Sequence, residues 1–516
     1  MRLALSLGAK RLELTVFFHR YRKNDYLCRA MKRVIIIGAG ISGLTAAVYA
    51  CRSGFEVLVL EKAGNPGGVS TSWCRKGYTF EGGVHWLIGA KEDLPLHAVW
   101  KETGALQENN PVYYKDPIYT LVDDTGQMQL RRDLNRLEIN GFRDKLALAL
   151  MRFHIACFRH FHTPIMDMPG LKSRYPRGFH PMEFVRMLPA VILTPFLMLR
   201  SASDYARRFR NPRIHALLDA VVEPSINALS LIYTLSTFSA GDSGYPQGGS
   251  LLMAQNMADC LASLGGEIRY HTSVLSVARE GDAVCVQTAS ETLHADAVII
   301  SMDARKAIDK LFGEPLQERW AQRMRKHLKT TQCMFVGLGI KADLSAYPRS
   351  MQLVLQRPFT VAGITYKTLV INNYARETAY APSGCTVLTC LLHGDSYAYW
   401  AAAKADGSYA AKKQETIALL IDRLADRIPE VKTSVEVTDM ATPLTYERYC
   451  DTFQGSYMSH WEALKRVPHA PVRFAPGIYF TGQRVSFSGG LPPAAETGHR
   501  TAQTLCKDFG VEFVSR

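Results

Sequence analysis

The sequence predicts an α/β fold in which a Rossmann-type domain is interwoven with a second, α+β domain. A strand, a glycine turn, a helix and a second strand follow one another within Val34–Glu61. The last 45 residues return to the order of strand, glycine turn and helix. A long helical and strand-rich region lies between these units, and 516 residues are too many for one compact core. We therefore expect both ends of the chain to build one domain, with the second inserted between them.

The first predicted strand is Val34–Ile37, a continuous β-branched run that is typical of a strand buried on both faces. Leu44–Arg52 has the composition of a helix, and Gly54 follows as its C-terminal cap. Phe55–Leu60 is a second apolar run. Together these segments have the size of one βαβ unit.

The turn between the first strand and the helix contains Gly38, Gly40 and Gly43 in a GxGxxG pattern. Gly38 permits the tight turn, Gly40 lets the backbone approach a pyrophosphate, and Gly43 lets helix and strand pack closely. The helix N-terminus presents free N–H groups and a partial positive charge to phosphates. Glu61, 23 positions after Gly38, can accept hydrogen bonds from ribose and would repel a 2′-phosphate. The pattern predicts a bound dinucleotide other than NADP.

Periodicity and turn residues predict the other elements. Residues 141–215 read mainly as helices, 245–249 as a turn, 251–264 as a helix capped by Gly265-Gly266, and 416–428 as an amphipathic helix. Strands are expected at 267–270, 273–279, 283–288 and 297–301, and again within a strand-rich region at 331–400. The last helix is expected at 494–506.

Two further glycine motifs favour FAD over NAD. Gly67 and Gly68 form a pair just after the ribose-binding position, where backbone can pack around an extended dinucleotide, although an ordinary Pro-Gly turn is the alternative. Near the C-terminus, a strand runs into Gly482, and Ser488–Pro493 leads into a second helix N-terminus. The sequence has no second GxGxxG with a following acidic residue. NAD(P) is therefore expected only as a transient electron partner.

These motifs together resemble the FAD-dependent phytoene desaturase-like family, which includes carotenoid desaturases, carotenoid isomerases and retinol saturases. The matching stretches are 34–62, 65–89, 244–270, 442–449 and 477–502, which span nearly the whole chain from Arg33. The stretches 244–270 and 477–502 are the more specific to this family. The resemblance implies an amine-oxidase-like flavoprotein fold, in which the Rossmann-type domain binds FAD and the α+β domain binds the substrate.

The motifs and the resemblance together define a set of candidate cofactor-binding residues. The first motif would hold the ADP part, the glycine pair the pyrophosphate, Val274 the adenine, and the C-terminal motif the ribityl chain and the isoalloxazine. The set consists of Gly38, Gly40, Ile41, Ser42, Gly43, Glu61, Lys62, Gly67, Gly68, Val69, Val274, Gly482, Gln483, Gly490 and Leu491. No metal site is predicted, because the 11 cysteines show no CxxC pair and no Cys/His cluster at metal spacing.

Three positions bear on the chemistry. The segment Gly82–Trp86 resembles a stretch that passes near the flavin in the family, so His85 is a candidate for moving a proton there; a structural hydrogen-bonding histidine is the alternative. Amine-oxidase relatives often have Arg where this chain has Val69, and many have Asp where it has Gln483. These two departures make amine oxidase chemistry less favoured.

The segment 141–215 concentrates positive charge. It holds 13 basic and 4 acidic residues, and so contributes nine of the chain's net charge of +14. Phe, Met and Leu are interleaved with the basic residues, which suits either a peripheral contact with anionic lipid or a solvated face over a normal core. Nucleic acid is not an expected partner, because no recognition motif accompanies the charge.

We expect a reducing, cytoplasmic compartment, because the cysteines are unpatterned and no apolar run is long enough to span a bilayer. The lipid-contact alternative for 141–215 would place the chain peripherally on the cytoplasmic membrane face. The predicted boundaries are an N-terminal extension, 1–30; the FAD-binding domain in three parts, 31–95, 226–310 and 466–516; a helical, basic region, 96–225; and a strand-rich substrate domain, 311–465. Met31-Lys32-Arg33 reads as a natural start, which leaves the role of the extension open.

The predicted activity is hydride transfer between FAD and carbon–carbon bonds of a long apolar isoprenoid, such as a carotenoid or a retinoid. Desaturation, saturation and isomerisation all remain open as its direction. One alternative is a flavin oxidase for amines or porphyrinogens. Another is a non-enzymatic escort protein that binds isoprenoid without flavin, which the intact fingerprint with Glu61 disfavours.

Overall fold

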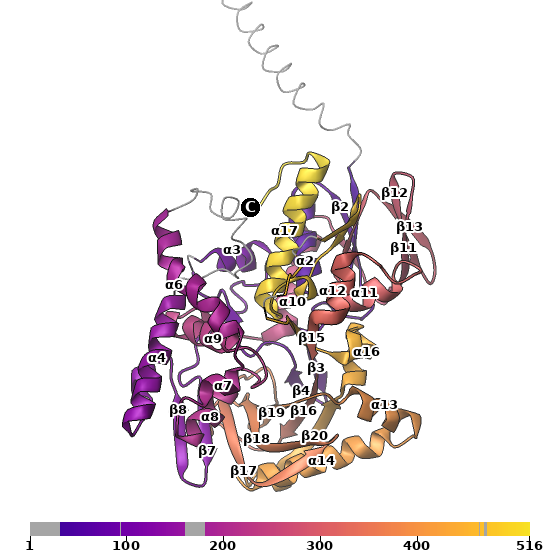
Figure 1. Ribbon diagram of the computed structural model, residues 1–516. Helices are drawn as coiled ribbons and strands as arrows, with labels where there is room; N and C mark the ends of the chain where they lie inside the picture. Colours follow the sequence, from indigo (N-terminus) through magenta and orange to yellow (C-terminus); the bar gives the residue numbers. More distant parts are fainter. Residues whose placement is uncertain (1–30, 93, 160–180, 464, 469–471) are drawn as a thin grey trace, which may run out of the picture.

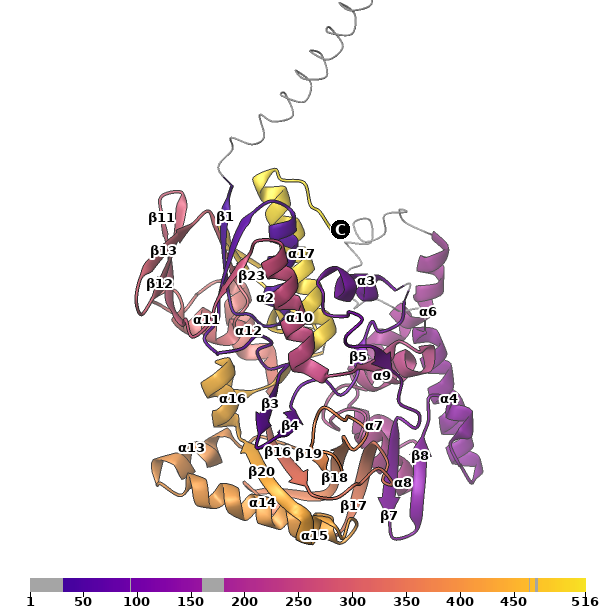
Figure 2. The same ribbon diagram turned by 180° about the vertical axis from the view of Figure 1, so that it is seen from behind.

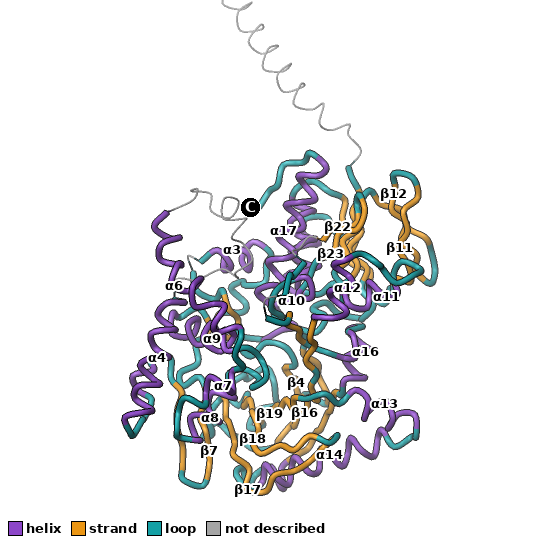
Figure 3. The backbone as a smooth tube through the Cα atoms, viewed as in Figure 1, coloured by secondary structure: helices purple, strands orange, loops and turns teal. Residues whose placement is uncertain are grey.

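A computed structural model describes residues 31–92, 94–159, 181–463, 465–468 and 472–516 (Figure 1). The predicted extension 1–30 and residues 160–180 of the predicted basic region lie outside the described residues. The described chain forms a six-stranded sheet and a seven-stranded sheet, with a group of helices beside them (Figure 3).

The six-stranded sheet is built from three separate parts of the chain. Its strands are β1 (Arg33–Ile37), β2 (Glu56–Leu60), β10 (Glu267–Arg269), β14 (Ala297–Ile300), β22 (Val472–Ala475) and β23 (Ile478–Phe480). They lie in the order β10-β2-β1-β14-β23-β22, and all neighbours are parallel except β22 and β23. The Rossmann-type domain is therefore interwoven along the sequence, as the α/β prediction requires.

Alternate residues of β1 enter different cores, which explains its unbroken apolar sequence. Val34 and Ile36 pack in the core that contains residues of α2 (Ile41–Arg52), α10 (Gly249–Ser263) and α17 (Leu491–Phe509). Ile35 and Ile37 face the core of α11 (Ala304–Lys310), α12 (Arg319–His327) and the small antiparallel sheet β11 (Val274–Glu280), β12 (Ala283–Thr288) and β13 (Thr292–Ala295). Both faces of the parallel sheet are covered, and Figure 2 shows α10 beside α2 on one of them.

The second domain is organised around the seven-stranded sheet, in the order β20-β16-β19-β18-β17-β7-β8. Its strands are β7 (Tyr119–Asp123), β8 (Gly126–Leu130), β16 (Cys333–Ile340), β17 (Ser350–Val361), β18 (Ile364–Asn373), β19 (Thr386–His393) and β20 (Val435–Ala441). Trp400 of α13 (Tyr397–Ala405) and Leu420 of α14 (Tyr409–Ala425) pack into its core.

A helical group forms its own core beside β7 and β8. It consists of α4 (Phe142–Phe158), α6 (Pro181–Met198), α7 (Ala202–Ala206), α8 (Pro212–Asp219) and α9 (Ala228–Ala240). Figure 1 shows α4 and α6 together at the edge of the molecule. Among the described helices, none is long and apolar enough to cross a bilayer.

Smaller elements connect these parts. They are α3 (Pro95–Glu102), α15 (Val431–Ser434), α16 (Pro443–Cys450), β3 (Ser72–Arg75), β4 (Tyr78–Glu81), β5 (Leu87–Ile88), β6 (Val112–Tyr113), β9 (Ser243–Pro246), β15 (Leu328–Thr331), β21 (Met458–Trp461) and the 3-10 turns Leu134–Arg136, Phe453–Gly455 and Gln483–Val485.

The structure corrects several predicted elements. The predicted turn at 245–249 overlaps strand β9, whose backbone pairs with β5 and β6. Local pattern missed this strand, because both of its partners lie far away in the sequence. The predicted helical region 96–225 contains β7 and β8, which complete the large sheet. The helix predicted at 416–428 is α14, which begins at Tyr409 and ends at Ala425. Helix α2 ends with Ser53 as its C-cap, and Gly54 follows it with φ +94°.

The crossing of α2 and α17 is unusually close at Gly498. A Cβ atom on Gly498 would lie 2.3 Å from the backbone oxygen of Ser42. We expect Gly498→Ala to lower the free energy of unfolding by about 1–3 kcal/mol, because the two helices must separate to admit the methyl group. Chemical denaturation checks this, with Gln503→Ala on the same helix as the control. Equal stability of the two variants would contradict it.

Candidate functional site

A cavity of about 720 Å³ runs between the two domains. Residues from β1, α2, β2 and β11 line one end, the C-terminal turn lines its middle, and residues from α9, β18 and β19 line the other end. Of the predicted cofactor-binding residues, Gly43 alone does not line it. His85 lines it as well.

The predicted fingerprint and the predicted glycine pair contact each other directly. Gly40 and Gly67 form an isolated parallel bridge, and the N–H of Gly67 donates to the carbonyl of Ala39 at 2.9 Å. A Cβ on Gly68 would lie 3.4 Å from the Cα of Gly40. Gly43 has the packing role that its position suggests, since a Cβ there would lie 2.0 Å from the carbonyl oxygen of Gly38. The Pro-Gly segment is thus part of the cavity wall.

Glu61 stands at the end of β2 and anchors the fingerprint turn. Its carboxylate accepts from the N–H groups of Ala39 and Ala63, each at 2.7 Å. Burial raises the pKa of Glu61, although these N–H donors oppose that shift. The carboxylate still lines the cavity, where it can accept from a ribose hydroxyl. Lys62, beside it, pairs with Asp451 at 3.5 Å.

The C-terminal turn is held to the fingerprint helix by hydroxyl groups. Ser42 Oγ lies 3.0 Å from Thr481 Oγ1, and Thr497 Oγ1 accepts from the N–H of Gly482 at 3.1 Å. Gln483 closes the turn: its Oε1 accepts from the N–H of Gly490, and its Nε2 donates to the carbonyl of Tyr457, both at 3.1 Å. The amide of Gln483 therefore has a positioning role in this turn.

The two helix N-termini at the cavity are not equivalent. Helix α2 begins after Gly40 and has no side-chain cap, so its first N–H groups face the cavity. Helix α17 begins after Gly490, but Pro492 and Pro493 carry no N–H, and the N–H of Ala494 already bonds to Gly490. In its first turn this leaves the N–H of Leu491 for a ligand, so α2 is the stronger anion-binding terminus.

These features fit a dinucleotide. The Cβ position of Gly40 has no atom within 4 Å, which leaves room for a phosphate against the backbone. An uncapped helix N-terminus lies beside it, and the Glu61 carboxylate and Val274 lie towards the adenosine end. Val69, Ile41 and Leu491 supply apolar wall between the polar contacts.

The far end of the cavity is mainly apolar. Its wall contains Trp86, Tyr119, Phe158, Leu229, Tyr233, Val370, Leu391 and Phe487. The same end also carries Asp219, Glu223, Asn372 and His393, so it suits a ligand that is mainly apolar and passes a few polar groups.

His85 lies in this part of the cavity and is held by Asn372, whose Nδ2 donates to His85 Nδ1 at 3.3 Å. Burial lowers the pKa of His85 to about 3, and the nearby Lys115 and His393 add to the shift. The imidazole is therefore neutral near pH 7. It can hold or accept a proton, but its hydrogen bond to Asn372 also serves the structural alternative, so the catalytic role stays a prediction.

A second imidazole, on His393, was not singled out from the sequence. His393 is the last residue of β19, and its Nδ1 lies 3.2 Å from the hydroxyl of Tyr457. Burial lowers the pKa of His393, and Glu223 opposes the shift. Because Tyr457 also accepts from Gln483, this pair is connected to the C-terminal turn. Sequence pattern alone contained no signal that would join residues 393 and 457.

Buried Glu81 fixes the segment that carries His85. Its carboxylate accepts from the N–H groups of Gly83 and Val84 and from the N–H and hydroxyl of Ser250, at 2.6–3.0 Å. Burial raises the pKa of Glu81, and the four donors oppose the shift. Since Gly249 begins α10, the carboxylate also lies at the N-terminus of that helix.

The comparisons with known proteins agree with this geometry. The family model for flavin containing amine oxidoreductases matches residues 41–506. The chain belongs to this family. It is a flavoenzyme, an oxidoreductase whose cofactor is FAD, and the residues around the cavity that fit a dinucleotide are those that would hold it.

Relatives of known activity are distant in sequence but similar over most of their length. Prolycopene isomerase of Daucus carota is 25% identical, over 93% of this chain and 80% of the relative. 4,4′-Diapophytoene desaturase of Methylomonas sp is 22% identical, over 93% and 96%. All-trans-retinol 13,14-reductase of Danio rerio is 24% identical, over 90% and 85%. These proteins support the predicted phytoene desaturase-like resemblance.

Solved structures confirm the amine-oxidase-like fold. Putrescine oxidase with bound putrescine has a TM-score of 0.63 at 15% identity, covering 93% of this chain and 99% of that one. Cyclohexylamine oxidase of Brevibacterium oxydans has a TM-score of 0.61 at 15% identity, covering 93% and 100%. At this identity the likeness concerns the fold alone.

The neutral, partly buried imidazole of His85 predicts a pH dependence of stability. In the unfolded chain a histidine takes up a proton below about pH 6.5, whereas folded His85 does so only near pH 3. The unfolded state therefore binds more protons between these values, and folding stability falls as the pH decreases through this window. We expect His85→Gln to retain about 2 kcal/mol that the parent protein loses between about pH 6.5 and about pH 5.

Chemical denaturation of both proteins at the two pH values measures this difference. Equal losses in the parent and in His85→Gln would contradict it.

Proposed function

We propose that the chain transfers hydride between FAD and carbon–carbon bonds of a long apolar isoprenoid of the carotenoid or retinoid class. The apolar far end of the cavity carries the proposal. The names of the relatives support it, because they act on prolycopene, diapophytoene and retinol. Bound flavin would supply the hydride-accepting or hydride-donating centre.

The residues of the far end would bind and orient the substrate. Leu229, Val370 and Leu391 present aliphatic surface, and Trp86 and Phe487 present aromatic surface, so a polyene can lie against them while water is excluded. These walls thus favour a long, apolar substrate. Whether that substrate is oxidised or reduced would depend on the redox partner of the flavin.

Two neutral imidazoles would accept or donate protons beside the reacting carbons. Low pKa values keep His85 and His393 uncharged, which suits an apolar ligand. A neutral imidazole can take up or pass on a proton, and the 3.2 Å contact between the Tyr457 hydroxyl and His393 Nδ1 orients the second ring. We expect saturation or isomerisation to use such a proton, whereas desaturation would release one.

An amine substrate is the second candidate, favoured by one observation. Asp219 and Glu223 also line the cavity, and a carboxylate can pair with an ammonium group. Burial raises the pKa of Asp219, however, which weakens it as a counter-ion. The predicted departures at Val69 and Gln483 also favour the isoprenoid.

The test is anaerobic incubation of the purified flavin-containing protein with carotenoids, retinoids and simple amines in turn. We expect a change in flavin absorbance or a mass-resolved isoprenoid product with a polyene, and no flavin reduction by amines. Rapid reduction by an amine, without any effect of a polyene, would replace the proposal with the amine oxidase alternative.

A cavity-filling variant tests the assignment of the far end. Val370→Phe adds volume to the wall at the far end of the cavity, so kcat/KM for the polyene should fall at least about tenfold, or about 1.4 kcal/mol. Flavin content should be unchanged, since Val370 is remote from the fingerprint. Loss of flavin from Val370→Phe, or an unaltered kcat/KM, would contradict the assignment.

We further propose that the helical group makes the predicted peripheral membrane contact. Helix α4 exposes Phe142, Leu146, Leu150 and Phe153 at helical spacing, with exposed fractions of 38–84%. Neighbouring α6 and the residue after it expose a second stripe: Met182, Val185, Leu188, Ile192, Phe196 and Leu199. Exposed apolar surface of this extent marks an interaction site rather than ordinary solvated surface. We name these ten residues the apolar stripe.

Basic side chains surround the apolar stripe and indicate an anionic bilayer as its partner. Arg143, Lys145, Arg152, Arg186 and Arg200 are exposed on the same two helices or next to them. The carboxylate of Asp144 is turned inward and accepts from the backbone of residues 210 and 211. The same α4 contributes Phe158 to the cavity wall, so one helix carries part of the stripe and part of the proposed substrate site. An apolar substrate dissolved in lipid would then have a short path.

Vesicle binding tests the contact. Leu146→Ser with Phe196→Ser should weaken co-sedimentation with anionic vesicles at least about tenfold, since each side chain contributes apolar area to the bilayer. Binding of the parent protein should also weaken as salt is added. Leu264→Ser, which changes an exposed leucine on another part of the surface, is the matched control. Equal binding by all three proteins would contradict the proposal.

A further inference from the structure

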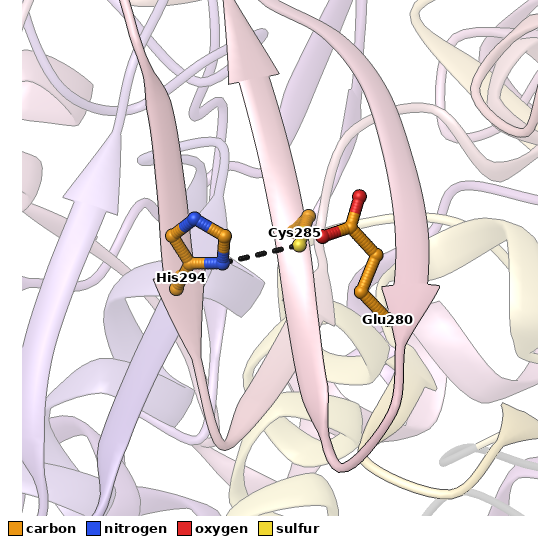
Figure 4. Close-up of side chains that lie close together, drawn as sticks. All are labelled: Glu280, Cys285 and His294. Atoms are coloured by element: carbon orange, nitrogen blue, oxygen red, sulfur yellow. Dashed lines mark hydrogen bonds between the residues drawn. The ribbon is translucent and has the colours of Figure 1, made fainter.

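The outward face of the small sheet β11–β12–β13 carries three side chains of metal-ligand type. Cys285 and His294 are directly paired across β12 and β13. Glu280 lies on β11, whose residue 278 is opposite Cys285, so its side chain is on the same face two positions along. The alternate residues Val284, Val286 and Leu293 point into the core. Figure 4 shows the three polar side chains converging, one from each strand.

The distances among their ligand atoms are close to those around a zinc ion. The Cys285 sulfur lies 3.2 Å from His294 Nδ1, and the three ligand atoms all lie within 4.8 Å of one another. Two ligands of tetrahedral Zn²⁺, at bond lengths near 2.0–2.3 Å, lie about 3.6 Å apart. Small changes of side-chain rotamer would therefore bring all three onto one ion without moving the strands.

The chemistry of the three groups also suits zinc better than a nucleophilic role. Cys285 is buried, with only 5% of the residue exposed, which disfavours a thiol that must contact an external substrate. The order in space is also wrong for a thiol–imidazole–carboxylate relay, because the thiol lies between the imidazole and the carboxylate. A bound divalent cation would instead hold the Cys285 thiolate and the Glu280 carboxylate together, because its positive charge stabilises both negative charges.

We propose that Glu280, Cys285 and His294 form a binding site for one zinc ion, with a water molecule as the fourth ligand. Thiolate, imidazole and carboxylate are the ligand types that zinc takes in proteins, and thiolate disfavours Mg²⁺ and Ca²⁺. No spacing motif marks these ligands, because they are 5 and 9 positions apart and meet only across the sheet.

The ion would clamp three strands at the outside of the FAD-binding domain. Strand β11 begins at Val274, which lines the adenosine end of the cavity. The ligands themselves are not among the cavity residues. The proposed zinc site would thus have a stabilising or regulatory role that is independent of the proposed isoprenoid chemistry.

Binding is measured on the purified flavin-containing protein with Zn²⁺ in competition against a chromophoric chelator, and with Co²⁺ as a spectroscopic probe. We expect one zinc per chain and cobalt bands typical of a thiolate ligand in a tetrahedral site. Zinc should also raise the midpoint of thermal unfolding by mass action.

Matched variants decide the assignment. Cys285→Ser and His294→Gln should each weaken zinc binding at least tenfold and remove the thermal shift. Glu280→Gln should weaken binding less, because its amide oxygen can still coordinate. Cys74→Ser, which changes an exposed cysteine on β3, should bind zinc as the parent does. The proposal is overturned if the parent binds no zinc at micromolar concentration, or if Cys285→Ser binds it unchanged while its flavin content and unfolding midpoint without metal match the parent.

Discussion

The close crossing of α2 and α17 is the constraint on which the cofactor site depends. Both helices start at the carboxyl edge of the parallel sheet, where β1 and β23 end, so their N-termini converge on one cavity. Gly498 allows this approach, because a Cβ there would lie 2.3 Å from the backbone oxygen of Ser42. Gly43 lets α2 lie close to the turn after β1, where a Cβ would lie 2.0 Å from the oxygen of Gly38. The hydroxyls of Ser42, Thr481 and Thr497 then replace the missing side-chain contacts with hydrogen bonds. Residues from the two ends of the chain thereby form a single wall.

A buried carboxylate and a buried ion pair hold the loops around this crossing. The Glu81 carboxylate accepts hydrogen bonds from the backbone of Gly83 and Val84 and from the start of α10. These bonds position the segment from which His85 points into the cavity. Arg484 and Asp303, both less than 5% exposed in their side chains, pair at 2.9 Å and tie the C-terminal turn to the end of β14. Removing one partner of such a pair typically costs about 3–5 kcal/mol, since the other charge stays buried. These groups act on the site through position rather than through contact with a ligand.

The cavity consequently has two halves of different character. The FAD half is made largely of backbone: glycine turns, an uncapped helix N-terminus and one carboxylate. The half that we propose to bind substrate is made of side chains from α9, β18 and β19 and neighbouring loops, and its mainly apolar wall also contains His85, Asn372, His393 and two carboxylates. Proteins of this fold can keep the same cofactor, because its site is formed by backbone. Substitutions of the side chains in the other half can suit the site to different substrates. This division explains how one fold carries both the amine oxidases and the isoprenoid enzymes to which the chain is similar.

The sequence by itself determined the βαβ unit, the fingerprint at Gly38–Gly43, the acidic Glu61 and the C-terminal glycine turn, because each is encoded in adjacent residues whose backbone chemistry is local. Only the tertiary structure decided that β7 and β8 complete the large sheet, that β9 pairs with β5 and β6, and that Gln483 closes a turn. It also brought His393 to Tyr457, and Glu280 to Cys285 and His294. These contacts join residues from different strands and loops, so no local period or spacing could specify them; they follow from strand order and register, which the whole core selects.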